Sequence, residues 1–201
     1  SVAPETFPVA LMELAKAVAL VKSHACEWNI DTERIMVCGF SAGGHLAACL
    51  GMMWNRDFLY GPLNMAPEDI QPKGMILCYP VITSGEFGHK RSFEQLLGGK
   101  AGDPRLRELV SLELQTGPHT PRTLLWHTWT DQSVPAENSL LLAQALKKAG
   151  VSLEMHIYPS GCHGLSLATE EVSDSTGDCL VPHCQGWMEL VKEWIKEKDR
   201  E

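Results

Sequence analysis

The sequence predicts an α/β fold, in which a parallel sheet of about four strands is flanked by helices on both faces. Four short apolar runs bounded by turn residues have the length of buried strands. Longer segments with apolar residues at helical spacing lie before, between and after these runs. Strands that alternate with helices usually pair in parallel and are covered on both faces. We therefore expect one domain over residues 1–201.

The elements are expected in a definite order along the chain. A helix with an apolar stripe spans residues 7–28 and ends before Asn29. The expected strands are residues 34–38, 73–80, 122–128 and 152–158, and the other long helices are residues 41–54, 133–149 and 184–198. Residues 55–71 contain Gly-Pro and Ala-Pro breaks and are expected to form a loop. Residues 83–120 form an irregular insertion that can cap a pocket, with short helices near residues 92–97 and 104–109.

Composition excludes several classes of partner. The chain has 17 Lys and Arg against 25 Asp and Glu, a net charge of −8, so no basic surface is expected to bind nucleic acid. No apolar stretch approaches the length that spans a bilayer, and we expect no membrane partner. The seven cysteines include several inside apolar runs, which is typical of reduced thiols. No signal peptide is visible, and we expect a cytoplasmic protein.

The most informative motif is Gly39-Phe40-Ser41-Ala42-Gly43, a G-x-S-x-G pattern between a predicted strand and a predicted helix. This is the setting of a nucleophile elbow, where a sharp strained turn presents the serine hydroxyl at the edge of the sheet. Gly39 and Gly43 are expected to let the strand and the helix pass closely. The alternative is a plain glycine-containing turn without chemistry.

A serine nucleophile needs a base, and the base needs an orienting carboxylate. Asp131 follows the third predicted strand and His163 follows the fourth, in the chain order Ser, Asp, His. Because the carboxyl ends of parallel strands meet at one edge of the sheet, all three side chains are expected there. Alone, Asp131 is also typical of a helix cap or turn, and His163 of an ordinary loop. Together with Ser41 they predict a catalytic triad.

The predicted chemistry is acyl transfer to water. His163 takes the proton of Ser41, which attacks an ester carbonyl, while Asp131 holds the His163 tautomer. The backbone N–H of Ala42, at the start of the helix, is expected to donate to the oxyanion. We expect neither a metal ion nor an organic cofactor, because this chemistry needs none.

Other chemistry-bearing residues are weaker candidates. His45 lies one turn into the helix after Ser41, where packing or local hydrogen bonding is the expected role. Cys162 adjoins His163, but Ser41 already occupies the elbow. Four residues near the C-terminus could bind a metal, although their spacing matches no standard zinc site: Asp178, Cys179, His183 and Cys184. Three aromatic residues flank strand ends and could line a substrate pocket, with core packing as the alternative for the second: Tyr79, Trp126 and Trp129.

These motifs resemble a known family. The matching segments are residues 39–47, residues 125–128, Asp131 with Val134-Pro135 and Glu137-Asn138-Ser139, and His163-Gly164-Leu165. The chain resembles bacterial α/β-hydrolases of the acetyl-xylan-esterase and xylanase-associated esterase group, which is related to prolyl-oligopeptidase-like hydrolases. From about Phe7 to the C-terminus, the resemblance implies the C-terminal part of an α/β-hydrolase fold. It also implies small-molecule ester substrates, with acetylated sugars among them.

The chain departs from the family at its N-terminus. Family members carry an earlier segment with further strands and a glycine-rich loop that supplies a second oxyanion N–H, and nothing here matches it. We expect a chain truncated at the N-terminus, or one whose exposed elbow strand is covered by another copy in a homo-oligomer. Loss of one oxyanion donor typically costs about 10²–10³ in turnover.

Three functions follow from these observations. The first is a serine carboxylesterase that cleaves small, mainly acetyl, esters. The second is a serine peptidase of the prolyl-oligopeptidase type, which uses the same triad. The third is a catalytically silent fragment or binding module that retains the triad.

Overall fold

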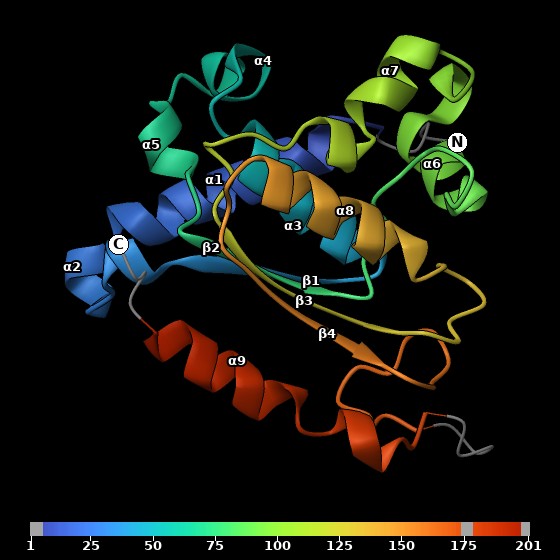
Figure 1. Cartoon of the computed structure of the whole chain (residues 1–201). Helices are drawn as coiled ribbons and strands as arrows, with labels where there is room; N and C mark the ends of the chain where they lie inside the picture. Colours follow the sequence, from blue (N-terminus) through green and yellow to red (C-terminus); the bar gives the residue numbers. More distant parts are fainter. Residues whose placement is uncertain (1–5, 174–178, 198–201) are drawn as a thin grey trace.

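The computed structural model describes residues 6–173 and 179–197, which surround a four-stranded, all-parallel sheet (Figure 1). The strands are β1 (Met36–Phe40), β2 (Gly74–Cys78), β3 (Arg122–Thr128) and β4 (Leu153–Tyr158), and they lie in sequence order. Phe40 pairs with Cys78 and Thr128 pairs with Tyr158, so the strands end nearly level. All four carboxyl ends therefore lie at one edge of the sheet.

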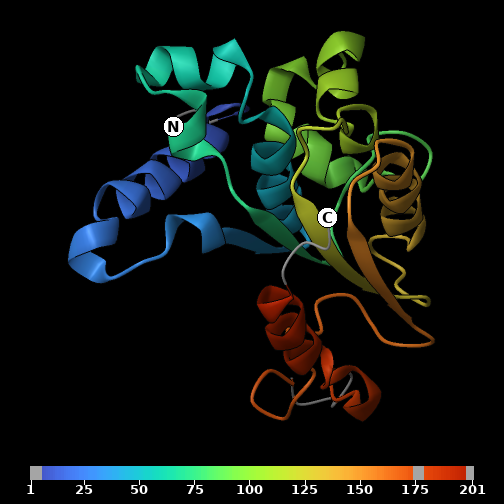
Figure 2. The ribbon, with the colours of Figure 1, turned by 60° about the vertical axis from the view of Figure 1, so that its left-hand side comes forward.

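Helices cover both faces of the sheet (Figure 2). The helices on one face are α1 (Val9–Ser23), α3 (Ala42–Met53) and α8 (Glu137–Lys148), whereas α9 (Trp187–Lys196) packs on the other. Successive strand residues point to opposite faces. Met75 and Leu77 join the core with α1, α3 and α8, while Ile76 and Cys78 join the core with α9. The predicted fold class is confirmed.

The elbow strand begins two residues later than expected. Residues 34–38 were predicted, but β1 is Met36–Phe40, because Thr32–Arg34 form a 3₁₀ turn. The side chain of Asp31 accepts a hydrogen bond from the backbone N–H of Glu33 and so stabilises that turn. The shift brings β1 up to Ser41 itself.

The boundaries of the longer helices also differ from the prediction. The first helix is interrupted at His24, giving α1 and a short α2 (Ala25–Trp28), after which Asn29 takes a left-handed conformation (φ 54°). Helix α8 begins at Glu137 instead of residue 133, because the preceding residues form a turn around Asp131. The last helix begins at Trp187, after a 3₁₀ turn at Pro182–Cys184.

Residues 55–71 were predicted to be a loop, and this was wrong in part. They contain α4 (Asp57–Tyr60), a 3₁₀ turn at Gly61–Leu63 and α5 (Pro67–Ile70). Proline is favoured in the first turn of a helix, where its missing N–H costs nothing. The Asp69 carboxylate also accepts from the backbone N–H of Ala66 at 3.0 Å. Leu59 and Ile70 are fully buried, so tertiary packing stabilises these short helices.

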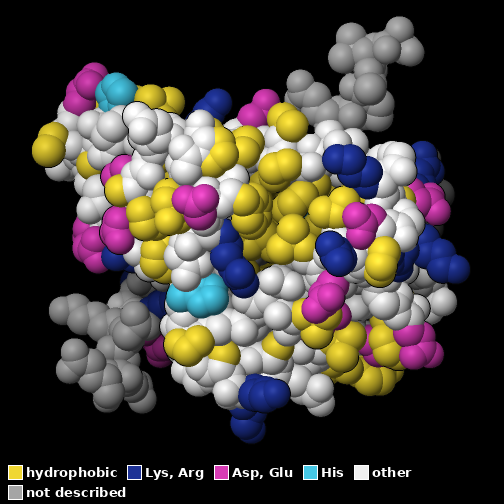
Figure 3. All heavy atoms as spheres, turned by 90° about the horizontal axis from the view of Figure 1, so that it is seen from above, with side chains coloured by type: hydrophobic (Ala, Val, Ile, Leu, Met, Phe, Trp, Pro, Cys, Tyr) yellow, Lys and Arg dark blue, Asp and Glu magenta, His cyan; other side chains and the backbone are white. Residues whose placement is uncertain are grey.

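The insertion at residues 83–120 contains the two short helices that the sequence predicts. They are α6 (Lys90–Leu97) and α7 (Pro104–Leu109), and the second is capped by the Asp103 carboxylate. Phe93 and Leu97 of α6 pack with Val81 and Val134, close to the carboxyl ends of the strands. Seen from above, the helix-covered side of the molecule has hydrophobic side chains in its middle and charged ones around them (Figure 3). A capping role for the insertion stays a prediction.

Strand β1 lies at the edge of the sheet. An apolar groove of about 460 Å³ runs beside it and is lined by residues of α1, β1 and α3 that include Val18, Val37 and Leu46. Phe40 is 38 % exposed although it contacts the rings of Tyr79 and Trp187. The expected apolar edge is therefore present in the described part of the chain.

Among the described residues, none of the helices has both the length and the apolar character of a membrane span.

Asn138 connects α8 to the segment after β2 by hydrogen bonds. Its Oδ1 accepts from the backbone N–H groups of Ile82 and Thr83, and its Nδ2 donates to the carbonyls of Phe87 and Pro135. The residue is fully buried, and four hydrogen bonds use the full capacity of its amide. This anchor sets the position of the turn that precedes α8.

Replacing Asn138 with Ala tests the anchor. Two buried N–H groups lose their acceptor, and each unsatisfied group costs about 1–3 kcal/mol, so the free energy of unfolding should fall by about 3 kcal/mol. Urea unfolding followed by circular dichroism measures this change. Gln144→Ala, at an exposed position of the same helix, is the control and should stay within about 0.5 kcal/mol of the parent. Equal midpoints for the two variants would show that the anchor contributes little.

Candidate active site

Ser41 lies between β1 and α3 in a backbone conformation that few L-residues adopt, with φ 54° and ψ −119°. Three hydrogen bonds hold it there. Its N–H donates to the carbonyl of Cys78, and its own carbonyl accepts from the N–H groups of His45 and Val81. Strained backbone of this kind persists where surrounding bonds over-determine it and is common at functional sites. The Ser41 hydroxyl consequently leaves the sheet at its carboxyl edge.

Two glycines allow the tight passage at the elbow: Gly39, as the sequence suggested, and Gly44 in place of Gly43. A Cβ on Gly39 would lie 2.1 Å from the carbonyl oxygen of Gly43, so only glycine fits there. A Cβ on Gly44 would lie 2.8 Å from Cβ of Pro80. Gly43 itself has open space at its Cβ position and lines the apolar groove beside β1. The close approach therefore involves Gly39 and Gly44.

Ser41, His163 and Asp131 form a continuous chain of hydrogen bonds. The Ser41 Oγ lies 2.7 Å from Nε2 of His163, and Nδ1 of His163 lies 2.6 Å from Oδ2 of Asp131. A carboxylate only accepts, so Nδ1 of His163 carries the proton and Nε2 is left to accept from the serine hydroxyl. The His163 side chain is 20 % exposed, whereas that of Asp131 is fully buried. The fold thus brings together residues that lie 122 positions apart.

Loop hydrogen bonds hold His163 in place. The hydroxyl of Thr128 donates to the carbonyl of Gly161, and the hydroxyl of Thr130 accepts from its N–H. Both bonds join the segment before Asp131 to the segment before His163. The ring of Tyr79 also meets the His163 ring edge-on, with centroids 5.1 Å apart. The imidazole is therefore fixed from two sides.

The Asp131 carboxylate serves two structural purposes at once. Oδ1 accepts from the N–H groups of Ser133 and Val134, both at 2.9 Å, and Oδ2 faces His163. Burial alone would raise the pKa of Asp131, but hydrogen bonds from His127, His163 and Val134 outweigh it and hold that pKa well below its usual range. Oδ1 thus holds the turn and Oδ2 holds His163. Because these groups donate to the carboxylate, it stays ionised.

Comparison with known proteins identifies the family. Residues 1–146, which include Ser41 and Asp131, match the family BD-FAE. The chain belongs to the BD-FAE family. Endo-1,4-beta-xylanase B of Butyrivibrio fibrisolvens is 36% identical over 161 residues, which are 80% of this chain and 25% of that protein. Acetylxylan esterase of Xylanibacter ruminicola is 33% identical over 169 residues, which are 82% of this chain and 32% of that protein.

Solved structures agree on the fold. An acetyl ester-xyloside bifunctional hydrolase from Caldicellulosiruptor lactoaceticus superposes with a TM-score of 0.81 at 39% identity, over 96% of this chain and 67% of that chain. The carboxylesterase Cest-2923 from Lactobacillus plantarum gives 0.82 at 27% identity, over 97% and 70%. The chain has the α/β-hydrolase fold. It spans a quarter to a third of the two curated relatives and about two thirds of these structures.

The aromatic residues near the site divide into core and surface. Trp126 is completely buried and packs against Tyr79 and Tyr158, so the core alternative holds for it. Tyr79 is also buried, and its hydroxyl accepts from the N–H of Ser166. Trp129, on the loop after β3, is 60 % exposed. Of the three, Trp129 is the one with an aromatic surface free to meet a ligand.

A cavity of about 220 Å³ opens beside Ala42, the first residue of α3. Val81, Phe93 and Leu96 give it apolar walls, and His45 lies at its inner side. His45 is buried and meets the ring of Phe93 edge-on, so it has the packing role that the sequence suggested, and its Nε2 lies 2.9 Å from the carbonyl of Val110. Helix α6 of the insertion therefore contributes to the surroundings of the elbow.

The cysteine-rich segment near the C-terminus packs beneath the His163 loop. Sγ of Cys162 lies 3.4 Å from Sγ of Cys179, and Cys184 is buried near the carbonyl of Ser160. Within residues 6–173 and 179–197, no group of three or more His, Cys, Asp or Glu side chains is arranged to hold a metal. Asp178, the remaining residue of the candidate metal set, lies outside the described residues.

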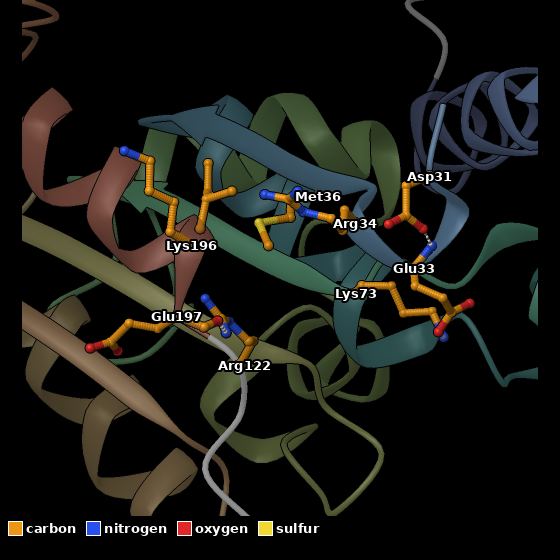
Figure 4. A pocket seen from close by; sticks show the side chains of 9 residues that line it. Asp31, Glu33, Arg34, Met36, Lys73, Arg122, Lys196 and Glu197 are labelled. Carbon is orange, nitrogen blue, oxygen red and sulfur yellow. Dashed lines mark hydrogen bonds and ion pairs between the residues drawn. The ribbon is translucent and has the colours of Figure 1, made fainter. Parts of the chain in front are cut away.

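A separate hollow of about 710 Å³ lies at the amino ends of the strands (Figure 4). Its walls include Arg34, Lys73 and Arg122, but acidic and carbonyl groups already engage two of these cations. Lys73 pairs with Glu33 at 2.8 Å, and Arg122 donates to the carbonyl of Glu197. The hollow is at the opposite end of β1 from Ser41, so it takes no part in the chemistry of the triad.

His45 gives a pH-dependent prediction. Burial lowers its pKa from 6.5 to about 4, and the hydrogen bond to Val110 opposes this only in part. Between these values the unfolded chain binds a proton that the folded chain does not, so stability rises with pH across this window. As the pH falls from 6.5 to 4, the free energy of unfolding should drop by about 3 kcal/mol more than in His45→Gln.

Urea titrations of both proteins at several pH values measure this difference. The variant removes the titrating ring but keeps a side-chain amide that can donate to the Val110 carbonyl. Parallel pH profiles for the two proteins would show that His45 does not couple folding to protons.

Proposed function

We propose that this chain carries the catalytic triad of a serine hydrolase that cleaves small carboxylic esters through an acyl-enzyme. The hydrogen-bonded chain from Ser41 through His163 to the buried Asp131 is the observation that carries the proposal. The strained elbow and the family membership support it. The names of the relatives, an acetylxylan esterase and an acetyl ester-xyloside hydrolase among them, point to the same bond class.

The acylation step follows from the protonation states of the triad. His163 Nε2 accepts the Ser41 proton as Oγ attacks the ester carbonyl, and the Asp131 carboxylate stabilises the resulting imidazolium. The tetrahedral intermediate carries its negative charge on the former carbonyl oxygen. The N–H of Ala42, at the amino end of α3, donates one hydrogen bond to this oxygen. Collapse of the intermediate expels the alcohol, which takes the proton from His163.

Deacylation uses the same groups with water as the nucleophile. His163 accepts a proton from water as the water oxygen attacks the acyl-Ser41 carbonyl. Collapse of the second tetrahedral intermediate releases the carboxylic acid, and the leaving Ser41 Oγ takes the proton back from His163. A second oxyanion donor would strengthen both steps, and the family resemblance assigns it to a glycine-rich loop that residues 1–201 do not match. We therefore propose the esterase activity for the whole protein that contains this chain.

The substrate class that best fits is an acetylated sugar. Relatives with xylan-related names support this, and the apolar cavity of about 220 Å³ beside Ala42 has room for a short acyl group. The peptidase alternative shares the triad and differs only in the scissile bond. A silent fragment or binding module is the remaining alternative. A cytoplasmic location and a homo-oligomer also stay predictions, the first on the basis of the seven cysteines.

Ser41→Ala tests the nucleophile. Loss of the hydroxyl removes acyl-enzyme formation, so turnover of aryl acetates and acetylated xylo-oligosaccharides should fall by at least about 10³-fold. Assays should use the natural full-length product that contains this chain. Ser152→Ala, at an exposed position at the far end of β4, should leave turnover unchanged. Equal turnover in the Ser41 variant and its parent would refute the assignment.

Covalent labelling separates the three functions. A fluorophosphonate should label Ser41 and no other residue, because His163 activates that hydroxyl alone; mass spectrometry of the peptides locates the label. Labelling with turnover of acetyl esters and not of peptides supports the esterase. Labelling with turnover of peptides alone supports the peptidase. Absence of both label and turnover supports the silent module.

A further inference from the structure

We propose that His127 is a positioning residue of the triad, which holds the Asp131 carboxylate and limits how strongly Oδ2 raises the basicity of His163. This inference rests on the proposed function of Ser41, Asp131 and His163. It concerns a second histidine on the same carboxylate, which the sequence placed in a motif without assigning it a role.

His127 occupies a buried position in the strand that leads to Asp131. It is the sixth residue of β3, and no part of its side chain is exposed to solvent. Its Nε2 lies 3.3 Å from Oδ2 of Asp131 and 2.9 Å from the carbonyl oxygen of Val134. Its Nδ1 lies 2.7 Å from Oγ of Ser139, on the first turn of α8. Both ring nitrogens therefore have defined partners.

These partners decide which nitrogen carries the proton when the ring is neutral. The two groups near Nε2, a carbonyl and a carboxylate, can only accept, so Nε2 carries the proton and shares it between them. Nδ1 is then an acceptor, and the Ser139 hydroxyl donates to it. Ser139 therefore holds the ring at Nδ1 and Val134 holds it at Nε2. The same Nε2 also lies beside Oδ2 of Asp131.

Oδ2 of Asp131 consequently lies between two imidazoles. His163 donates to it at 2.6 Å, and Nε2 of His127, whose hydrogen bond runs to the Val134 carbonyl, lies 3.3 Å from it. A donor on a carboxylate oxygen stabilises the ionised form and makes that oxygen less basic. His127 therefore keeps the negative charge on Asp131 while reducing the pull of Oδ2 on the His163 proton. The proton stays on Nδ1 of His163. The carboxylate stabilises the imidazolium, but not so strongly that the ring cannot release its proton again.

The direction of the effect follows from this balance. Without His127, Oδ2 has fewer donors and more charge to offer His163, so the His163 imidazolium becomes more stable and its pKa rises. His163 then stays protonated up to a higher pH, so the acid limb of the kcat/KM profile moves to higher pH. Asp131 and Tyr79 are titratable groups that face His163, and Asp131 also lies against the His127 ring. The hydrogen-bond partners of His127, Val134 and Ser139, carry no charge.

The experiment compares two substitutions at position 127. His127→Leu has similar bulk and no donor, whereas His127→Gln carries an amide N–H that can reach the place of Nε2. Nuclear magnetic resonance titration of the His163 ring in a Ser41→Ala background reports its pKa without any turnover. The pH profiles of kcat and KM are then measured on the full-length protein with Ser41 intact.

The expected result is a rise of about one unit in the His163 pKa for His127→Leu, and a return to within a few tenths of a unit for His127→Gln. In the same series, kcat of the Leu variant on the acid side of the profile should fall by up to about 10-fold with KM nearly unchanged, and its acid limb should move with the His163 pKa. Ser139→Ala, which removes the group that holds the ring at Nδ1, should give a smaller shift in the same direction.

An unchanged His163 pKa in His127→Leu overturns the proposal, even if kcat falls, because a purely structural role predicts that pattern. If His127→Leu does not fold, Ser139→Ala decides: no shift there also overturns the proposal. The proposed function can fail separately. An inactive, unlabelled parent protein refutes the esterase, while the titration still shows whether His127 controls His163.

Discussion

The buried negative charge of Asp131 is the interaction on which the rest of the site depends. A carboxylate cannot remain ionised inside a protein without donors, and here the donors come from three parts of the fold. The turn before α8 supplies two backbone N–H groups, the loop after β4 supplies His163, and β3 supplies His127. Each of these parts would be less well defined without Asp131. The same charge therefore organises the loops and prepares the base that the proposed chemistry needs.

The elbow at Ser41 imposes a second constraint, because its positive φ must be compensated by nearby bonds. The compensation comes from β2 and the residues that follow it, through Cys78 and Val81. The same segment is fixed by the Asn138 amide, which binds the N–H groups of Ile82 and Thr83. Asn138 belongs to α8, and α8 begins where the Asp131 turn ends. Nucleophile and carboxylate are thus connected through one buried polar framework as well as through His163.

The sequence predicted the parallel sheet and the triad positions because both depend on local patterns. Apolar runs of strand length mark β1 to β4, and Ser41, Asp131 and His163 follow the ends of β1, β3 and β4 in that order. It missed the short helices of residues 55–71, which depend on the burial of Leu59 and Ile70 in tertiary contacts. It also left His127 without a role. The signal was present, since a histidine inside an apolar strand must find buried partners, but their identity depends on how α8 folds back.

The position of β1 at the sheet edge separates two halves of the proposed chemistry. The bonds that connect the triad to the sheet run to β2, to β3 with the turn after it, and to the loop after β4, on the inner side of Ser41, while α3 adds the N–H of His45. Ala42 and Gly43 instead face the open side, where the cavity and the apolar groove lie. Proton transfer thus depends on contacts within the described residues, whereas stabilisation of the oxyanion depends on the open side. Activation of the nucleophile and stabilisation of the transition state are therefore separable. Labelling of Ser41 reports on its activation by His163, whereas turnover of an ester also requires stabilisation of the oxyanion.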